Sequence, residues 1–172
     1  MRKIFSTIPY RYSFFILFIA CGWELFSQNG YFNSLEQAML TPDSVISLNL
    51  KKQKIKEFPM EILKMKNIQR LDISRNYIKE IPPQISELKH LHYVNFAQNY
   101  LTTLPKEMAQ LPLDTLILWD NQIREFDESF STTNLKLLDI RAILMTRKEQ
   151  KAIKKIFSNT KIKKDHPCNC GR

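Results

Sequence analysis

Histidine and cysteine side chains are the first candidates for metal or redox chemistry in this chain of 172 residues. His166, Cys168 and Cys170 cluster near the C-terminus, but their spacing is not that of a zinc finger, which uses two paired sets of ligands. In an oxidising compartment the two cysteines could instead form a strained disulfide or pair between chains. His90 and His92 have no acid or nucleophile at a fixed spacing. We predict a flexible tail without metal, and no cofactor.

Motifs of known catalytic sites are also missing from the sequence. It contains no phosphate-binding loop, nucleophile elbow or zinc-protease helix motif. We therefore predict that the protein is not an enzyme. The remaining chemistry is recognition by aromatic and charged side chains, which requires elements that present them on one surface.

Those elements follow from a repeat of leucine-like residues. In residues 68–91 they occupy positions 1, 4, 6, 11, 14, 18 and 21, with asparagine at position 9 and proline at position 15. Five copies align, at offsets of 23, 23, 22 and 22 residues. The copies begin at Val45, Ile68, Leu91, Leu113 and Leu135. Alternation at positions 4 and 6 is typical of a short strand with one buried side.

The pattern resembles the leucine-rich repeat, whose period lies between 20 and 29 residues. The resemblance covers roughly residues 31–162. It implies an α/β fold, a short solenoid of about five coils with a parallel sheet on its concave face and helical caps at both ends. One coil cannot bury its own leucines, whereas stacked coils can share a continuous core.

An asparagine follows three of the five predicted strands. Asn76, Asn99 and Asn121 occupy position 9, where the chain leaves the strand and its backbone groups lose their sheet partners. Buried amide side chains can satisfy those groups. We therefore predict a structural asparagine ladder, with Gln53 in its place in the first copy and Ile143 in the last.

Residues at positions 3, 5, 7 and 8 alternate with the leucines and should point out of the sheet. In the first two copies they are polar or charged, whereas the last three include large apolar side chains. We expect the Arg141 guanidinium to lie over the Trp119 indole, which is either part of a binding site or a simple stacking pair. A cluster of this composition is typical of a binding hot spot. The predicted partner-binding residues are Tyr93, Ile117, Trp119, Asp120, Leu137 and Arg141.

Both ends of the repeats carry helix-capping sequences. Ser34-Leu-Glu-Gln37 and Thr146-Arg-Lys-Glu149 each fit a capping box. We predict an N-terminal cap over residues 28–44 and, after the repeats at 45–145, a C-terminal cap helix and closing segment over 146–163. Such caps cover a sheet edge and core that would otherwise be exposed. The predicted apolar sides are Leu35, Ala38, Met39 and Leu40 in the first helix, and Ala152, Ile153, Ile156 and Phe157 in the second.

Residues 1–27 have the organisation of a secretory signal peptide. Basic residues precede ten residues without charge that begin at Phe14, too few for a membrane span of about 20 residues. Cleavage after Ser27 would leave Gln28 as the first residue. One alternative is an imperfect lipobox with lipidation at Cys21, and another is an uncleaved anchor. Export is also what the resemblance to bacterial leucine-rich-repeat proteins implies.

The net charge of +9 belongs to the two ends of the chain. Residues 28–146 carry equal numbers of acidic and basic side chains, whereas residues 147–172 carry nine Lys or Arg against Glu149 and Asp165. The basic C-terminal helix could bind anionic lipid headgroups, or could simply be a solvated face that keeps the solenoid soluble. Residues 164–172 are predicted to be a flexible tail.

We therefore expect an exported, non-catalytic module, either secreted or in the cell envelope, that recognises a protein partner through its concave sheet face. The alternative is an envelope or adhesive component that binds glycan or an anionic lipid surface. Nucleic acid is not an expected partner of an exported protein, and membrane association would come from the leader or a lipid anchor. The sequence names neither the protein partner nor the oligomeric state.

Overall fold

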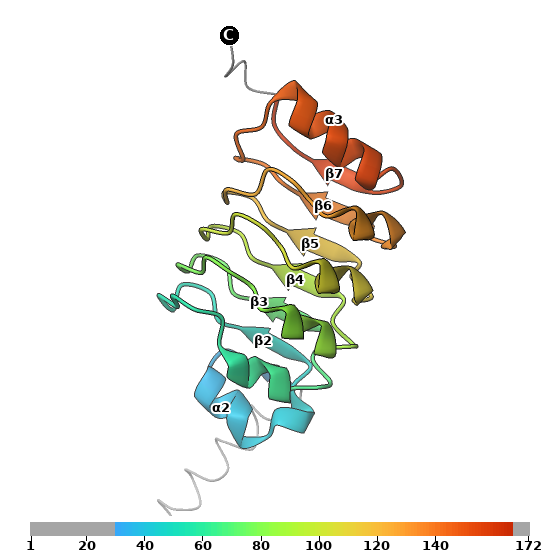
Figure 1. Ribbon diagram of the computed structural model, residues 1–172. Coiled ribbons are helices and arrows are strands. Elements are labelled where there is room, and N and C mark those ends of the chain that lie inside the picture. Colours follow the sequence, from blue (N-terminus) through green and yellow to red (C-terminus); the bar gives the residue numbers. More distant parts are fainter. Residues whose placement is uncertain (1–29, 167–172) are drawn as a thin grey trace, which may run out of the picture.

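A computed structural model describes residues 30–166, which form a stack of coils around one parallel sheet (Figure 1). Each strand pairs in parallel with the next in chain order, and position 3 of one repeat lies opposite position 3 of its neighbour. The predicted solenoid is confirmed, but the sheet has seven strands because a short strand is added at each end of the five repeats. The strands are β1 (Tyr31–Phe32), β2 (Ser47–Asn49), β3 (Arg70–Asp72), β4 (Tyr93–Asn95), β5 (Thr115–Ile117), β6 (Leu137–Asp139) and β7 (Lys161–Lys163).

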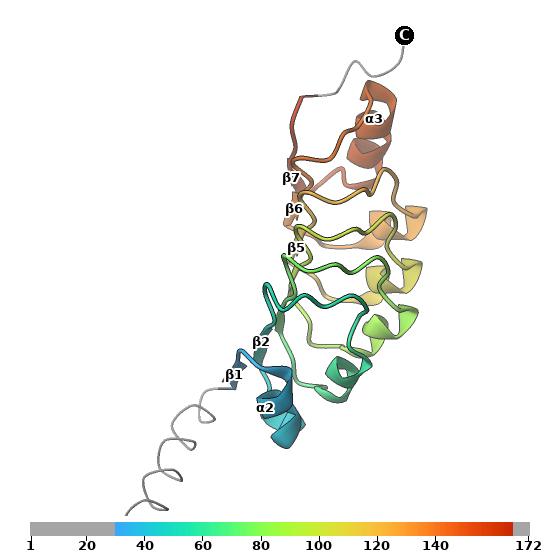
Figure 2. The same cartoon turned by 90° about the vertical axis from the view of Figure 1, so that its left-hand side faces the viewer.

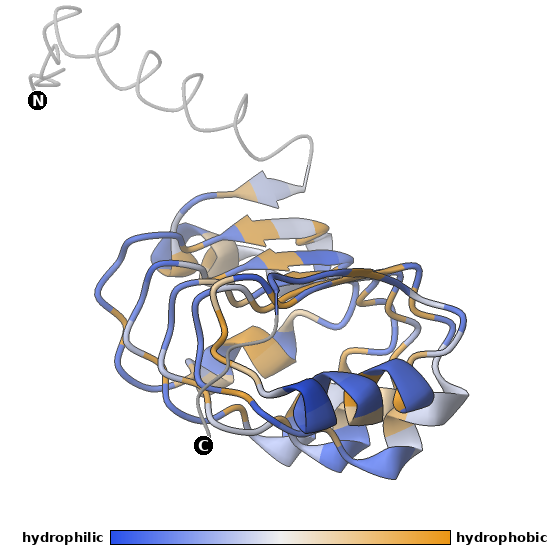
Figure 3. Ribbon diagram, turned by 90° about the horizontal axis from the view of Figure 1, so that it is seen from above, coloured by the Kyte–Doolittle hydropathy of each residue, from blue (hydrophilic) through white to orange (hydrophobic). Residues whose placement is uncertain are grey.

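Short helices return the chain on the side opposite the sheet (Figures 2 and 3). Three of the 3-10 helices follow a proline, Pro59, Pro82 or Pro105, in an extended conformation with φ near −70°. Proline fixes this angle and lacks the backbone donor that a strand would need. The helices are α2 (Leu35–Leu40), η1 (Pro42–Ser44), η2 (Met60–Lys64), η3 (Pro83–Glu87), η4 (Lys106–Gln110), η5 (Glu128–Thr132) and α3 (Arg147–Ile156).

The three ladder asparagines are buried between consecutive coils, as predicted. Asn99 shows the pattern: its Oδ1 accepts the Ile78 N–H at 3.0 Å, and its Nδ2 donates to the carbonyl oxygens of Ile73 and Phe96 at 3.1 and 2.9 Å. Asn76 and Asn121 make equivalent bonds. The asparagines therefore satisfy backbone groups of their own coil and of the preceding coil where the sheet ladder ends.

A left-handed backbone conformation precedes the asparagine position in all five copies. The residue at position 8 has φ between 54° and 61° in each of them, although none is glycine. Each such conformation costs about 1–2 kcal/mol for a residue with a side chain. The neighbouring coil holds the turn in place, because the position 8 N–H donates to the position 7 carbonyl oxygen of the next coil. These residues are Lys52, Arg75, Gln98, Asp120 and Ala142.

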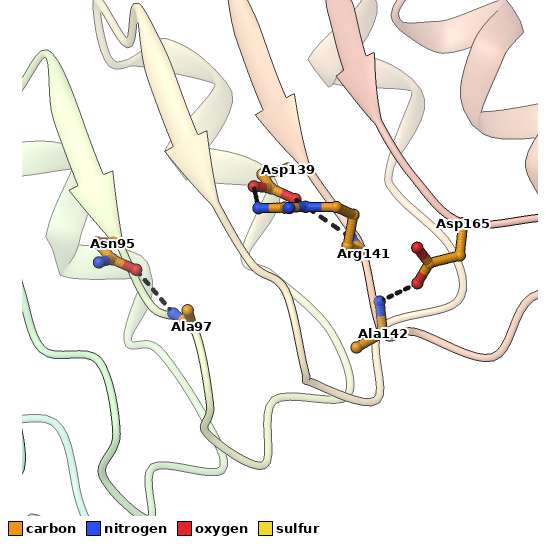
Figure 4. A network of polar contacts seen from close by, with 6 residues as sticks. All are labelled: Asn95, Ala97, Asp139, Arg141, Ala142 and Asp165. Atoms are coloured by element: carbon orange, nitrogen blue, oxygen red, sulfur yellow. Dashed lines mark hydrogen bonds and ion pairs between the residues drawn. The ribbon is translucent and has the colours of Figure 1, made fainter.

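The last coil has no following repeat, and Asp165 takes over this acceptor role. Its side chain accepts the Ala142 N–H, while its backbone oxygen accepts Gln150 Nε2 at 3.2 Å (Figure 4). The preceding β7 pairs with β6 in the same register as a repeat strand. The closing segment therefore supplies one more strand and one more turn acceptor to the final coil.

Helix α3 joins this end through a cluster of aromatic rings. Phe157 lies 5.1 Å from Phe126 and 6.0 Å from Phe130, measured between ring centroids. The predicted capping box is present, and the bonds from Thr146, first from its backbone N–H, hold the pKa of Glu149 below its ordinary value.

Two predicted helix faces need correction. Leu40, in α2, and Ala152, in α3, are exposed rather than buried. Each residue lies at the side of its helix, because the row of buried residues on that helix is narrower than the predicted apolar face. Helices thus occur at both ends of the stack, while their role as caps stays a prediction.

Several predictions concern residues outside this range. The signal peptide over 1–27, lipidation at Cys21, and the pair Cys168 and Cys170 all lie outside the described residues. None of the helices in residues 30–166 combines the length and the apolar composition that a bilayer span requires. The same residues contain no group of three or more His, Cys, Asp or Glu side chains placed to hold a metal ion.

Candidate functional site

The predicted binding residues lie together on the sheet face of the last three repeats. Tyr93 begins β4, Ile117 ends β5, and Leu137 begins β6. Trp119 follows β5 by two residues. These four side chains are half-buried, whereas Asp120 and Arg141, in the turns after β5 and β6, are exposed. The four apolar or aromatic side chains are thus less accessible than strand alternation alone predicts, since neighbouring coils stand close together.

The Arg141 guanidinium was predicted to stack on the Trp119 indole, but its main contact is with Asp139 instead. The Arg141 guanidinium pairs with the buried Asp139 carboxylate through Nε at 2.9 Å and through NH2 at 2.7 Å (Figure 4). These bonds raise the pKa of Arg141 above its ordinary value. A buried carboxylate requires such a partner. The main role of Arg141 is therefore to pair with Asp139 at the end of its own strand. Its exposed part remains available at the rim of the sheet face.

A cation–π contact occurs two strands earlier instead. The Arg70 guanidinium lies 4.1 Å from the centre of the Tyr93 ring. Burial raises the pKa of Tyr93, the Asp72 carboxylate adds to this effect, and the Arg70 charge opposes it. The Tyr93 hydroxyl therefore stays protonated, as a hydrogen-bond donor, over the physiological pH range.

Position 5 of the repeats carries a second polar ladder that the sequence reasoning missed. In four copies an Asn or Asp side chain at this position accepts the backbone N–H two residues later. The donors are Lys51, Ser74, Ala97 and Arg141, at distances of 3.1, 2.9, 3.1 and 3.3 Å. The acceptors are Asn49, Asp72, Asn95 and Asp139. The sequence signal was available, since four of five copies place Asn or Asp at this position.

The position 5 ladder corrects the prediction that positions 5 and 7 point outward in every copy. Position 7 was expected to point outward, yet Ser74 and Ala97 are buried, as is Asp139 at position 5. The backbone turns at the end of each of these strands, where the short position 5 side chain accepts a hydrogen bond from the backbone N–H at position 7. Much of the polar character of the sheet face is thus required by the fold and does not indicate a ligand.

Strand β5 is the exception to this arrangement. The residue at position 5 is Ile117, whose side chain has no acceptor for the backbone N–H of Trp119. The residue at position 7 is Trp119 itself, which has a large side chain. Figure 4 shows bonded strand ends on both sides, at Asn95 with Ala97 and at Asp139 with Arg141. The fourth repeat therefore lacks the hydrogen bond that a position 5 side chain makes in the other four repeats, and it presents two apolar side chains on the sheet face.

A second aromatic surface, also missed, lies at the edge of the stack where the chain leaves the asparagine ladder. Tyr77 and Tyr100 stack with ring centroids 6.1 Å apart and an interplanar angle of 16°, and each is 45% exposed. They occupy position 10 of consecutive repeats. They border a hollow of about 950 Å³ whose lining also includes Phe58, Met60 and Ile81. Position 10 lies after the turn, where strand alternation no longer applies, so the repeat pattern did not indicate it.

A family model described as leucine rich repeat matches residues 66–123. A solved leucine-rich-repeat protein of Leptospira interrogans is 25% identical, with a TM-score of 0.63, over 73% of this chain and 38% of that one. Internalin C2 of Listeria monocytogenes is 19% identical, with a TM-score of 0.61, over 77% of this chain and 57% of that one.

The same fold occurs in TLR13, solved in complex with a single-stranded RNA. That chain is 23% identical, with a TM-score of 0.63, over 80% of this chain and 20% of that one. This chain matches less than two thirds of the length of each of these three structures. No curated protein matches its sequence.

Proposed function

Because this chain is a leucine-rich repeat protein, we propose that it is a binding module that recognises a protein partner through the sheet face of β4 to β6. Proteins with this fold are generally interaction scaffolds without catalytic activity. The observation that carries the proposal is the exception at β5, where Ile117 and Trp119 replace the side-chain cap that four other repeats keep.

The argument rests on what the fold requires at these positions. A backbone cap at a strand end contributes about 1 kcal/mol, and the other repeats show that a short polar residue fits here. Leu116 and Leu118 already point inward and are fully buried, so the indole lies on the sheet face outside the core of this coil. An apolar pair in place of a structural cap therefore indicates selection for contact with another molecule.

The surroundings of Trp119 suit a protein partner. Half-buried Tyr93 and Leu137 lie on the neighbouring strands opposite Thr115, two residues before Ile117, while Asp120 and Arg141 form an exposed charged rim. Apolar anchors within a polar rim are the usual anatomy of a protein interface. The partner would lie along the sheet, with an apolar side chain against Trp119 and charges opposite those of the rim.

We also propose that the protein is exported, with a mature chain that begins at Gln28. Support comes from the basic start of the chain followed by a short apolar stretch. The intact mass of the protein purified from its native surroundings distinguishes this start from lipidated Cys21. A protein that retains Met1 in that fraction would contradict both.

The test of the binding face is Trp119→Ala. A partner is first captured with the wild-type protein and identified by mass spectrometry, and its affinity is then measured by calorimetry. Truncation of a hot-spot residue typically weakens binding by about thirtyfold or more, and we expect this loss with little change in melting temperature.

The matched control is Tyr100→Ala, which removes an exposed aromatic ring from the adjacent edge of the stack and should leave the affinity unchanged. If Trp119→Ala binds normally while Lys52→Ala or Arg75→Ala abolishes binding, the partner lies on the polar repeats. A loss with Tyr100→Ala alone would place the site at the tyrosine edge. Either result would reject the β4 to β6 face.

A further inference from the structure

The C-terminal end of the stack carries a dense group of exposed positive charges. Within residues 147–166 all eight Lys and Arg side chains are exposed. Only Glu149 and Asp165 are acidic there, and both carboxylates are bonded to backbone N–H groups, of Thr146 and Ala142. We define these eight residues as the basic end: Arg147, Lys148, Lys151, Lys154, Lys155, Lys161, Lys163 and Lys164.

Other parts of the described chain do not neutralise the basic end. Within residues 30–166, ion pairs join Lys66 to Glu87, Lys136 to Asp114 and Arg141 to Asp139, and none involves a cation of the basic end. Lys164 Nζ does bond, to the neutral amide oxygen of Gln150. Within the described residues the cations of the basic end thus have no ion-pair partner, and the acidic side chain of an earlier coil in the hollow beside Lys148 is Glu125.

Fold stability explains only part of the arrangement of charge on α3. Lys148, Lys151 and Lys155 are three and four residues apart, so they form one stripe opposite the buried Gln150 and Ile153. Like charges at these spacings destabilise a helix. The helix dipole favours positive charge in the last turn, which holds Lys154 and Lys155, but it disfavours Arg147 and Lys148 in the first turn, beside Glu149.

A protective role accounts for only part of the basic end. Lys161 and Lys163 lie on β7, the last strand of the sheet, and lysines on an edge strand discourage pairing with another chain. The stripe on α3 lies on a helix, which has no such edge to protect. Lys148 and Lys151, which lie outside the last turn of the helix, therefore call for a different explanation.

We propose that the basic end binds the surface of a membrane that contains anionic lipids. Lysines near such a surface are attracted to the headgroups without needing a specific pocket. Leu144 supports this choice: it is 71% exposed and lies two residues before the N-cap of α3, where it could insert among the acyl chains. The one Phe, Tyr or Trp within residues 144–166 is Phe157, which is buried, and this disfavours single-stranded nucleic acid.

The geometry of the stack gives this contact a defined orientation. Helix α3 and strand β7, which carry the basic end, lie at the opposite end of the solenoid from β1 (Figures 1 and 2). A membrane bound at the basic end therefore leaves the sheet face of β4 to β6 uncovered. The proposal is independent of the protein partner, and its test uses lipid alone.

The experiment is sedimentation of the full chain with vesicles of phosphatidylcholine, or of equal parts phosphatidylcholine and phosphatidylglycerol. Binding to the neutral vesicles measures any contribution of the apolar leader, so the difference between the two vesicles reports on charge. We expect stronger binding to the anionic vesicles and loss of that difference at high salt. Each lysine contributes about fivefold, so Lys148→Gln, Lys151→Gln and Lys155→Gln together should weaken the anionic component by about a hundredfold.

The matched control replaces three exposed lysines of the earlier repeats, Lys56, Lys79 and Lys89, with glutamine. It changes the net charge equally and should reduce binding far less. Equal losses in the two triple variants would overturn the proposal, since binding would then follow net charge alone. Equal binding of the wild type to both vesicles would also overturn it, as would binding to heparin or single-stranded RNA without vesicle binding.

Leu144→Ser, which keeps every charge, is expected to lower anionic binding severalfold. Circular dichroism verifies that each variant is folded.

Discussion

Removal of residues 147–172 is expected to yield a protein that aggregates or melts more than about 10 °C below the full chain. The deletion takes away α3, β7 and the tail. It exposes the edge of β6 and the apolar side chains that α3 covers, among them Phe126 and Phe130. Repeat proteins depend on terminal coverage of this kind for solubility.

Three separate contacts make the expected loss large. The buried ring of Phe157 packs edge to face on Phe126, and removing a buried Phe typically costs about 3–5 kcal/mol. Ile140 N–H would lose its acceptor on Lys163, and Ala142 N–H would lose the Asp165 side chain. A polar group left without a partner adds about 1–3 kcal/mol if it stays buried.

Two variants keep this test interpretable. Phe157→Ala removes one contact and leaves the chain length intact, so it should lower stability without abolishing folding. Deletion of residues 167–172 removes only residues predicted to belong to the tail, and should leave the melting temperature unchanged. Size-exclusion chromatography and thermal melting provide the measurements. A soluble deletion of 147–172 with a cooperative, unshifted melt would contradict a capping role for α3 and β7.

The repeat pattern predicted those features that depend on burial. Leucine-like residues at fixed offsets decide which side of each strand faces inward, because a shift of one residue would turn the whole set outward. Leu71, Val94 and Leu116 are accordingly paired across neighbouring strands and fully buried. The same reasoning placed Asn99 inside, since its position relative to those leucines is fixed.

Features that depend on side-chain competition could not be predicted from alternation. Asp139 was expected to face outward, but its carboxylate bonds Arg141 and the following backbone, which buries it. That bond also removes Arg141 from Trp119. Tyr77 and Tyr100 were missed because they follow the turn, where the period of two no longer applies. Strand β7 has lysines at both ends, so its sequence gives little apolar signal.

The asparagine ladder leads to the second large prediction: Asn99→Ala should lower the free energy of unfolding by about 1–3 kcal/mol. Asn99 lies in the middle of the stack and is only 5% exposed. Alanine leaves the Ile78 N–H without its acceptor and takes a donor from the Ile73 and Phe96 carbonyl oxygens. The Ile73 and Phe96 carbonyl oxygens retain the bonds from Asn76 and Asn121, so the main cost arises at the Ile78 N–H.

Urea unfolding of wild type and variant measures the effect, with Asn134→Ala as the matched control. Asn134 is exposed in the coil before β6, so its replacement should change stability by less than about 0.5 kcal/mol. Asn99→Asp separates the two halves of the amide: it keeps an acceptor for Ile78 but directs a carboxylate oxygen at carbonyl oxygens that need a donor. We expect it to be at least as destabilising as alanine at neutral pH, with the loss reduced in acid as the carboxyl gains a proton. Equal midpoints for Asn99→Ala and Asn134→Ala would show that solvent reaches the ladder and that its hydrogen bonds do not hold the coils together.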